Sequence, residues 1–147
     1  MQEISTDELN KLLADAKPGK ISDYLKDNSR YLAMEKKAFY YYYKDVVEKK
    51  GIKLKDIYTI AGVSESYGGK IVTMEKHTKD RDLIIRLCLA GHFSWIETNR
   101  ALKLYGMSEL YAKNPRDACV IVAINNRIFD PYRVDELLVK NGMGKLG

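Results

Sequence analysis

Cys88 and His92 are the two residues whose types and spacing could support covalent catalysis. They stand four positions apart, so a helix would place the thiol and the imidazole on one face. Cys88, however, lies inside the apolar run LIIRLCLA, and His92 follows Gly91 at the expected end of that helix. We therefore interpret the pair as a core thiol and a loop histidine. Cys119 lies in a second apolar run, ACVIVAI, which predicts two buried, unpaired thiols in a reducing cytoplasm.

The sequence lacks the motifs that mark most enzymes and metal sites. It has no phosphate-binding glycine loop, HExxH, GxSxG or CxxC, and its two cysteines are too far apart for metal-ligand spacing. Asp80 and Asp82 fit the compensation of a helix N-terminus better than acid–base catalysis. We expect a protein without enzymatic activity, cofactor or metal.

Lysine offers more chemistry than any other residue type in the chain. Between residues 35 and 81 the sequence has eleven Lys or Arg against seven Asp or Glu, a net charge of +4, and the whole chain carries a formal net charge of +5. Such a cluster can neutralise DNA phosphates, although an ordinary solvated face is the better explanation of any single lysine. The residues expected to contact phosphate are Lys53, Lys55, Lys76, Lys79 and Arg81.

Residues 54–76 supply the elements that would position these lysines. Apolar residues recur at helical spacing over 54–61, Gly62 can end that helix in the left-handed conformation, and Ser64 is a good N-cap for a second helix. The pattern predicts helices at about 54–61 and 65–76 joined as a helix-turn-helix. A plain structural corner needs the same turn residues, so both alternatives stay open. The side chains expected to face the DNA groove are Ser64, Ser66, Tyr67, Lys70 and Thr73.

The second of these helices lacks the side chains that read bases best. It contains no Arg, Asn or Gln, which make bidentate contacts to adenine or guanine, and Glu65 and Glu75 would repel nearby phosphates. Gly68 and Gly69 each lower helix propensity by up to about 1 kcal/mol relative to alanine. They could allow a close approach to DNA or mark an irregular start of the helix. The sequence therefore predicts positioning on DNA more clearly than discrimination among DNA sequences.

Helix signals also occur on both sides of this motif. Residues 4–15 begin with a capping box formed by Ser5 and Glu8, and another helix starts at Ser22, which predicts an N-terminal helical arm over residues 1–34. A further helix is expected at 35–50, where core packing explains the Tyr40–Tyr43 run better than base stacking does. Its apolar face is expected to contain Phe39, Tyr42, Tyr43, Val46 and Val47.

An internal repeat organises the rest of the chain. Arg81-Asp82 followed by LIIRLCLA matches Arg116-Asp117 followed by ACVIVAIN, 35 residues later, and ALKLYGMSEL matches LLVKNGMGKL. The repeat predicts two helical hairpins, residues 80–110 and 115–146, which cover each other's apolar faces. Helix starts are marked by a Ser94/Glu97 capping box and by Asn114-Pro115 and Asp130-Pro131. We expect residues 35–147 to form one all-α domain.

The overall composition is consistent with this organisation. Hydrophobic residues make up 46 % of the chain and charged residues 31 %, an ordinary globular balance that argues against disorder. No apolar run approaches the roughly 20 residues of a membrane-spanning helix, and the polar, acidic N-terminus lacks a secretory signal. A pI of about 9.1 weakly favours an anionic partner. We expect a cytoplasmic protein that does not associate with membranes.

Four segments carry a resemblance to a known group: AGVSESYGGKI, DRDLIIRLCL, SWIETNRALKLYGMSELY and the repeat PRDACVIVAI…VDELLVKNGM. Together they resemble small bacterial proteins with a phage-repressor-like, XRE-type helix-turn-helix, over about three quarters of the chain. The resemblance implies a lambda-repressor-like DNA-binding core, extended by a second helical hairpin, that acts in transcription regulation. It places DNA-facing residues at Ser64, Ser66, Tyr67 and Lys70.

Two hypotheses follow from these features. The first is a dimeric transcriptional regulator that binds double-stranded DNA. The second is a non-enzymatic interaction module, an inhibitor or adaptor built on a helix-turn-helix fold that has lost sequence-specific DNA reading. Three features support the second: the missing base readers, the acidic Glu65 and Glu75, and the tyrosine run at 40–43. The chain also departs from the group's pattern at Tyr58, Gly69 and residues 73–76, and these departures count against operator binding.

Overall fold

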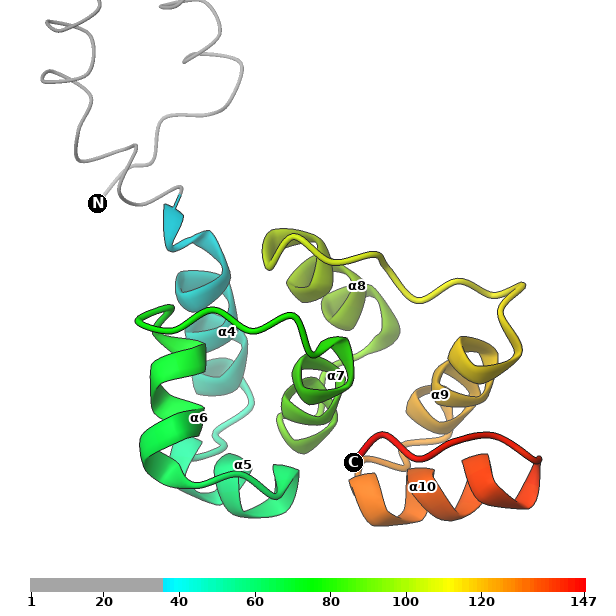
Figure 1. The fold of residues 1–147 in the computed structure, drawn as a ribbon. Coiled ribbons are helices and arrows are strands. Elements are labelled where there is room, and N and C mark those ends of the chain that lie inside the picture. The colour runs from blue at the N-terminus through cyan, green and yellow to red at the C-terminus, as the bar shows by residue number, and fades with distance from the viewer. Residues whose placement is uncertain (1–35) are drawn as a thin grey trace, which may run out of the picture. The chain divides into compact units, whose positions relative to one another are not determined.

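A computed structural model describes residues 36–147, and this part of the chain is helical throughout, without a strand (Figure 1). The predicted all-α class is confirmed. The helices expected at 4–15, with Ser5 and Glu8, and from Ser22 lie outside the described residues, as does the predicted arm. The helices that the structure describes are α4 (Ala38–Lys49), α5 (Leu54–Ala61), α6 (Glu65–Val72), α7 (Arg81–Ala90), α8 (Trp95–Leu104), α9 (Pro115–Asn125) and α10 (Pro131–Lys140).

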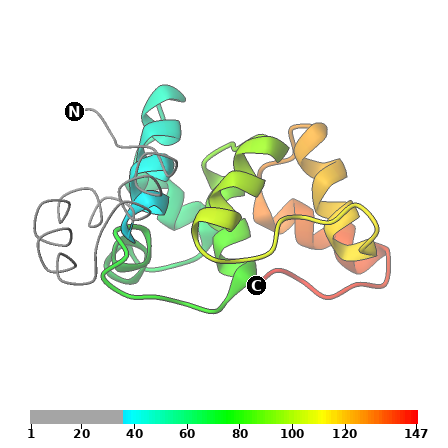
Figure 2. The same cartoon turned by 90° about the horizontal axis from the view of Figure 1, so that it is seen from above.

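Residues Phe39–Gly147 form one compact unit with three parts in a row. The first hairpin (residues 80–110, with α7 and α8) lies in the middle, with α4 to α6 on one side and the second hairpin (residues 115–146, with α9 and α10) on the other (Figures 1 and 2). No helix in the described residues is long and apolar enough to cross a membrane.

The aromatic side of α4 holds it against the first hairpin. Its predicted apolar residues are buried except Tyr42, which is half-buried. The hydroxyl of Tyr43 donates a hydrogen bond to the Leu87 carbonyl at 2.7 Å, which satisfies the one polar atom of a fully buried ring. Tyr41 points outward and is 44 % exposed. The tyrosine run is thus divided between the core and its rim.

The helix starts form as the sequence predicts. Ser94 and Glu97 make a reciprocal capping box at α8, and the side chain of Asn114 accepts a hydrogen bond at the start of α9. Asp130 caps α10 in the same way. Pro115 and Pro131 occupy first-turn positions where the missing N–H costs nothing.

The two hairpins are joined by a reciprocal pair of ion pairs. Both terminal nitrogens of Arg81 donate to the carboxylate of Asp117, each at 2.9 Å. Both terminal nitrogens of Arg116 donate in turn to Asp82, at 2.8 and 2.9 Å. Each hairpin therefore supplies the arginine for the other's aspartate, which is the pattern of an interface with two-fold symmetry.

Further hydrogen bonds repeat in the same register. Arg81 donates to the carbonyls of Ser108 and Glu109, and Arg116 donates to the matching carbonyls in the second hairpin. The N–H of Leu110 bonds to Asn99 at 2.8 Å, and the N–H of Leu146 bonds to the matching Asp135 at 2.7 Å. The sequence repeat is therefore a structural repeat whose copies pack as a pseudo-two-fold pair.

Candidate nucleic-acid interface

The junction of α5 and α6 is shaped by residues 62–64. Gly62 has φ of 77°, the left-handed region that suits glycine, and the N–H of Val63 bonds to the Tyr58 carbonyl at 3.0 Å. The Ser64 side chain accepts a hydrogen bond from the N–H of Tyr67 at 3.1 Å and caps α6. α5 has the bounds that the sequence predicts, and α6 begins where predicted.

α6 ends at Val72 rather than at the predicted residue 76. Met74 adopts a left-handed φ of 65°, and the N–H of Lys76 folds back to the Lys70 carbonyl at 3.1 Å. No glycine marks this reversal, so the sequence pattern gave no stop signal. Thr73 is consequently the half-buried C-cap of α6 and does not lie along its exposed face.

Gly68 allows α6 to pack closely on α5. It is buried, and a Cβ built at this position would lie 2.6 Å from Cδ1 of Tyr58 and 2.9 Å from Cγ2 of Val63. Burial, with the Glu65 carboxylate next in effect, raises the pKa of the Tyr58 phenol. The large tyrosine and the glycine thus complement each other, and Gly68 faces α5 and not the surface. At Gly69 the nearest atom, Oη of Tyr58, would be 4.0 Å from a Cβ.

Four of the five predicted groove-facing side chains are exposed at the N-cap or on the first two turns of α6. They are Ser64, Ser66, Tyr67 and Lys70. The ammonium group of Lys76 stands 6.0 Å from the centre of the Tyr67 ring, which is a cation–π distance. Glu65 and Glu75 are exposed in the same region, so the surface carries both signs of charge.

The lysines predicted to contact phosphate differ from the single arginine in that set. Within residues 36–147, none of Lys53, Lys55, Lys76 and Lys79 forms an ion pair, and all of them are exposed. Arg81 instead uses its donors on Asp117 and on two carbonyls. We therefore exclude Arg81 from the expected phosphate contacts.

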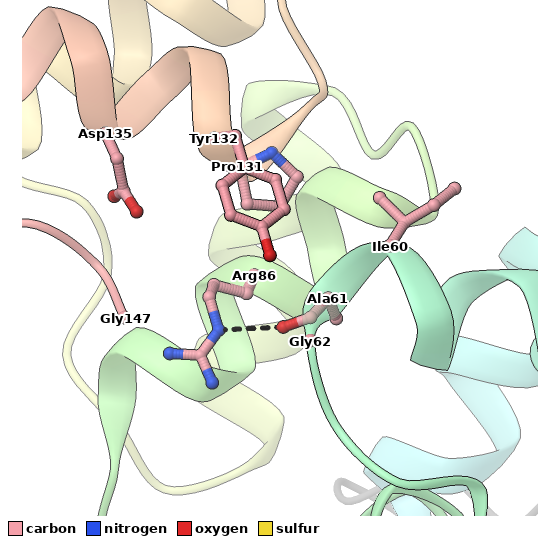
Figure 3. Close-up of a pocket in the computed structure, with 8 residues that line it drawn as sticks. All are labelled: Ile60, Ala61, Gly62, Arg86, Pro131, Tyr132, Asp135 and Gly147. Carbon is pink, nitrogen blue, oxygen red and sulfur yellow. Dashed lines mark hydrogen bonds between the residues drawn. The ribbon is translucent and has the colours of Figure 1, made fainter.

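Arg86 is a residue at this site that the sequence did not reveal. Its Nε donates to the Ala61 carbonyl at the end of α5 at 3.0 Å (Figure 3). A terminal nitrogen donates to the Leu146 carbonyl at 2.7 Å. One side chain thus fixes α5 relative to both hairpins. A small cavity of about 150 Å³ opens beside it, between the end of α5 and Pro131 and Tyr132 of α10. The sequence signal that could have indicated this role is the position of Arg86 inside the apolar run LIIRLCLA.

The thiols and His92 lie away from α6. Cys88 is fully buried and burial raises the pKa of its thiol, whereas Cys119 is only half-buried, contrary to the prediction. His92 stacks on Phe129 with the ring centres 4.7 Å apart, and partial burial, followed by Arg127 and Lys50, lowers its pKa. In the part of the chain that the structure describes, no group of three or more His, Cys, Asp or Glu could hold a metal ion.

Comparisons with models of protein families, with curated proteins and with solved structures give no match. The resemblance to XRE-type proteins therefore stays a prediction. The class of protein that the described residues define is an all-α unit with an internal pair of hairpins and an exposed short helix, α6.

Proposed function

We propose that this protein is a cytoplasmic transcriptional regulator that binds double-stranded DNA through α5 and α6 as a helix-turn-helix. The observation that carries the proposal is the exposed edge at the start of α6, where Ser64, Ser66, Tyr67 and Lys70 lie together. A helix presented in this way enters the major groove with its first residues towards the bases.

Phosphate contacts would come from two sources. The N-terminus of α6 offers backbone N–H groups and a partial positive charge to one phosphate. The exposed lysines before and after α6 would neutralise others, namely Lys53, Lys55, Lys76 and Lys79. Residues 36–79 hold ten Lys and five Asp or Glu, so this part of the chain carries a net charge of +5.

Sequence discrimination would be modest. Ser66, Tyr67 and Lys70 can donate hydrogen bonds to base edges, but none makes the bidentate contact of Arg, Asn or Gln. Glu65 at the first position of α6 would disfavour phosphate nearby. A homodimer that binds two half-sites would raise both affinity and specificity, as is usual for this class of DNA reader.

The test is the salt dependence of binding to random duplex DNA. Removal of two proposed phosphate contacts in Lys76→Ala/Lys79→Ala should reduce the slope of log affinity against log salt by about 1 for each contact. The matched control is Lys103→Ala/Lys113→Ala, which removes the same charge from exposed positions in the hairpin region and should leave the slope unchanged. Equal slopes in both double variants, or no binding at about 50 mM salt, would contradict the proposal.

A further inference from the structure

The first hairpin shows what its outer face binds, because α4 is packed on it. Phe39 meets the ring of Tyr105 edge-on with the centres 4.8 Å apart, and Tyr43 packs on Phe93 at 4.9 Å. The ammonium group of Lys50, just after α4, pairs with Glu97 at 2.9 Å. Arg100 lies 5.9 Å from the centre of the Tyr42 ring. α4 is thus an amphipathic helix held by aromatic contacts and one ion pair.

The second hairpin has the same face, and no helix among residues 36–147 covers it. The sequence repeat matches Leu87 with Val122, and their exposed fractions are 0 % and 58 %. A groove of about 240 Å³ lies on the second hairpin. It is lined by Ile128, just before α10, and by four residues of α10: Arg133, Glu136, Leu137 and Lys140. These five residues match, in order, Phe93, Glu97, Arg100, Ala101 and Leu104 of the first hairpin. The groove therefore lies where the pseudo-symmetric counterpart of α4 would pack.

The face has kept apolar side chains that a simple terminal cap would not need. Capping repeats present a polar outer surface to solvent, and Asn141 in place of Tyr105 follows that rule. Val122, Ile128 and Leu137 do not, and they remain partly or largely exposed. They match Leu87, Phe93 and Ala101 of the first hairpin, where Tyr43 of α4 bonds to the Leu87 carbonyl and packs on the ring of Phe93.

The groove lining carries two positive charges, Arg133 and Lys140, against one negative charge, Glu136, and this balance disfavours the basic α4 segment of a second copy. Arg133 stands where Glu97 pairs with Lys50 in the first hairpin, so the α4 segment of another copy would bring Lys50 towards an arginine. Like charges in contact disfavour an interface. A helix with a carboxylate at that point would instead form an ion pair.

We propose that this groove binds an amphipathic helix of a partner protein, in the position that α4 occupies on the first hairpin. The partner helix has large apolar side chains on one face, at i, i+3, i+4 and i+7, and an acidic residue that meets Arg133. The groove lies on the hairpin farthest from α6, so this binding does not depend on the proposed DNA contact (Figure 1).

The first experiment uses a synthetic peptide of residues 36–53 with Lys50→Glu as the probe, because α4 is the one helix in the described residues that packs on a surface of this kind. The full-length protein should bind the peptide with one-to-one stoichiometry, and Leu137→Asp, which changes an apolar residue of the groove lining, should weaken binding at least about tenfold. Val139→Asp is the matched control, since Val139 is an aliphatic residue two positions further along α10 that is 52 % exposed and lies outside the groove. Equal effects of the two variants, or no binding at about 1 mM peptide, would overturn the proposal.

The second experiment exchanges charges across the contact. The wild type should prefer the Lys50→Glu peptide over the peptide with the unchanged sequence, and Arg133→Glu in the protein should reverse the preference. Arg133 is exposed, so this variant should remain folded. An unchanged preference would contradict the proposed position of the partner helix. Self-association that Leu137→Asp abolishes would identify a second copy as the occupant and would also overturn the proposal.

Discussion

The two hairpins have the same internal hydrogen bonds but different surroundings. In each, an arginine and an aspartate at the start of the first helix reach the other copy, and a side chain of the second helix binds a backbone N–H near the end. Within residues 36–147, the first hairpin is covered on both sides, whereas the second is covered on one side only. The shared hydrogen bonds are therefore features of the hairpin itself, whereas differences between the copies reflect the helices that pack on each one.

Three matched pairs of core residues are apolar in both copies. They are Ile85 and Val120, Leu89 and Ile124, and Leu102 and Leu138, and all six side chains are at most 4 % exposed. On the outer side the copies differ, as Tyr105 and Asn141 do. The outer faces thus combine positions that are apolar in both copies, such as Leu87 and Val122, with positions that differ in polarity, such as Tyr105 and Asn141.

The largest expected difference between the copies comes from the matched outer residues Leu87 and Val122. Leu87→Ala removes a fully buried side chain and should lower the free energy of unfolding by about 3 kcal/mol. Val122→Ala should lower it by less than about 0.5 kcal/mol because the side chain is largely in water. Urea denaturation of both variants checks this. A similar loss for both would mean that the second hairpin's outer face is covered in solution.

A second comparison uses the two aspartates of the reciprocal ion pairs. Asp117 is buried and also accepts the N–H of Tyr111 at 3.0 Å, whereas both side chains of the Asp82–Arg116 pair are 29 % exposed. We expect Asp117→Ala to cost about 2 kcal/mol, below the usual range for a buried pair because Arg81 is 25 % exposed. Asp82→Ala should cost about 1 kcal/mol.

The measurement is again the midpoint and slope of urea unfolding at neutral pH. Asp45→Ala is a suitable control, since Asp45 forms an exposed ion pair with Lys49 within α4 and its loss should change stability by a few tenths of a kcal/mol. If Asp82→Ala cost as much as Asp117→Ala, the pseudo-symmetric pairs would be energetically equivalent despite their unequal burial.

Local sequence signals predicted the helices and their starts well because capping needs only neighbouring residues. The Ser94/Glu97 box and the Asn114-Pro115 start are examples. The roles of Arg81 and Arg86 could not be predicted in the same way, because their partners stand 25 to 60 positions away along the chain. The repeated Arg-Asp pair was visible in the sequence, but only packing reveals that each arginine binds the other copy's aspartate.

Gly68 shows the same limit at the candidate DNA site. Its sequence position fits either close approach to DNA or an irregular helix, and the distance from a Cβ to Tyr58 assigns it to packing between α5 and α6. The early end of α6 depends on Met74 in a left-handed conformation, which is uncommon for a residue other than glycine. Both features depend on tertiary contacts that short-range patterns do not contain.

The smallest expected effect is the pH dependence of the Asp117 contribution. Burial by itself would raise the pKa of the Asp117 carboxyl, but hydrogen bonds from Arg81 and from the N–H of Tyr111, with the charges of Arg81 and Arg116, hold the pKa below its ordinary value of 3.8. The unfolded chain therefore takes up this proton at a higher pH than the folded chain, and acid favours unfolding. The stabilisation is fully present above the unfolded pKa and is lost as the pH falls through the folded pKa.

Comparison of the wild type with Asp117→Asn isolates this contribution. The difference in their free energies of unfolding should be largest near neutral pH and should shrink as the pH falls below about 4, because a protonated Asp117 resembles the amide. Leu87→Ala is the matched control: it removes no titrating group, so its difference from the wild type should not change with pH. A difference for Asp117→Asn that stayed constant in acid would mean that Arg81 holds Asp117 by geometry alone, without the ionic contribution that joins the two hairpins.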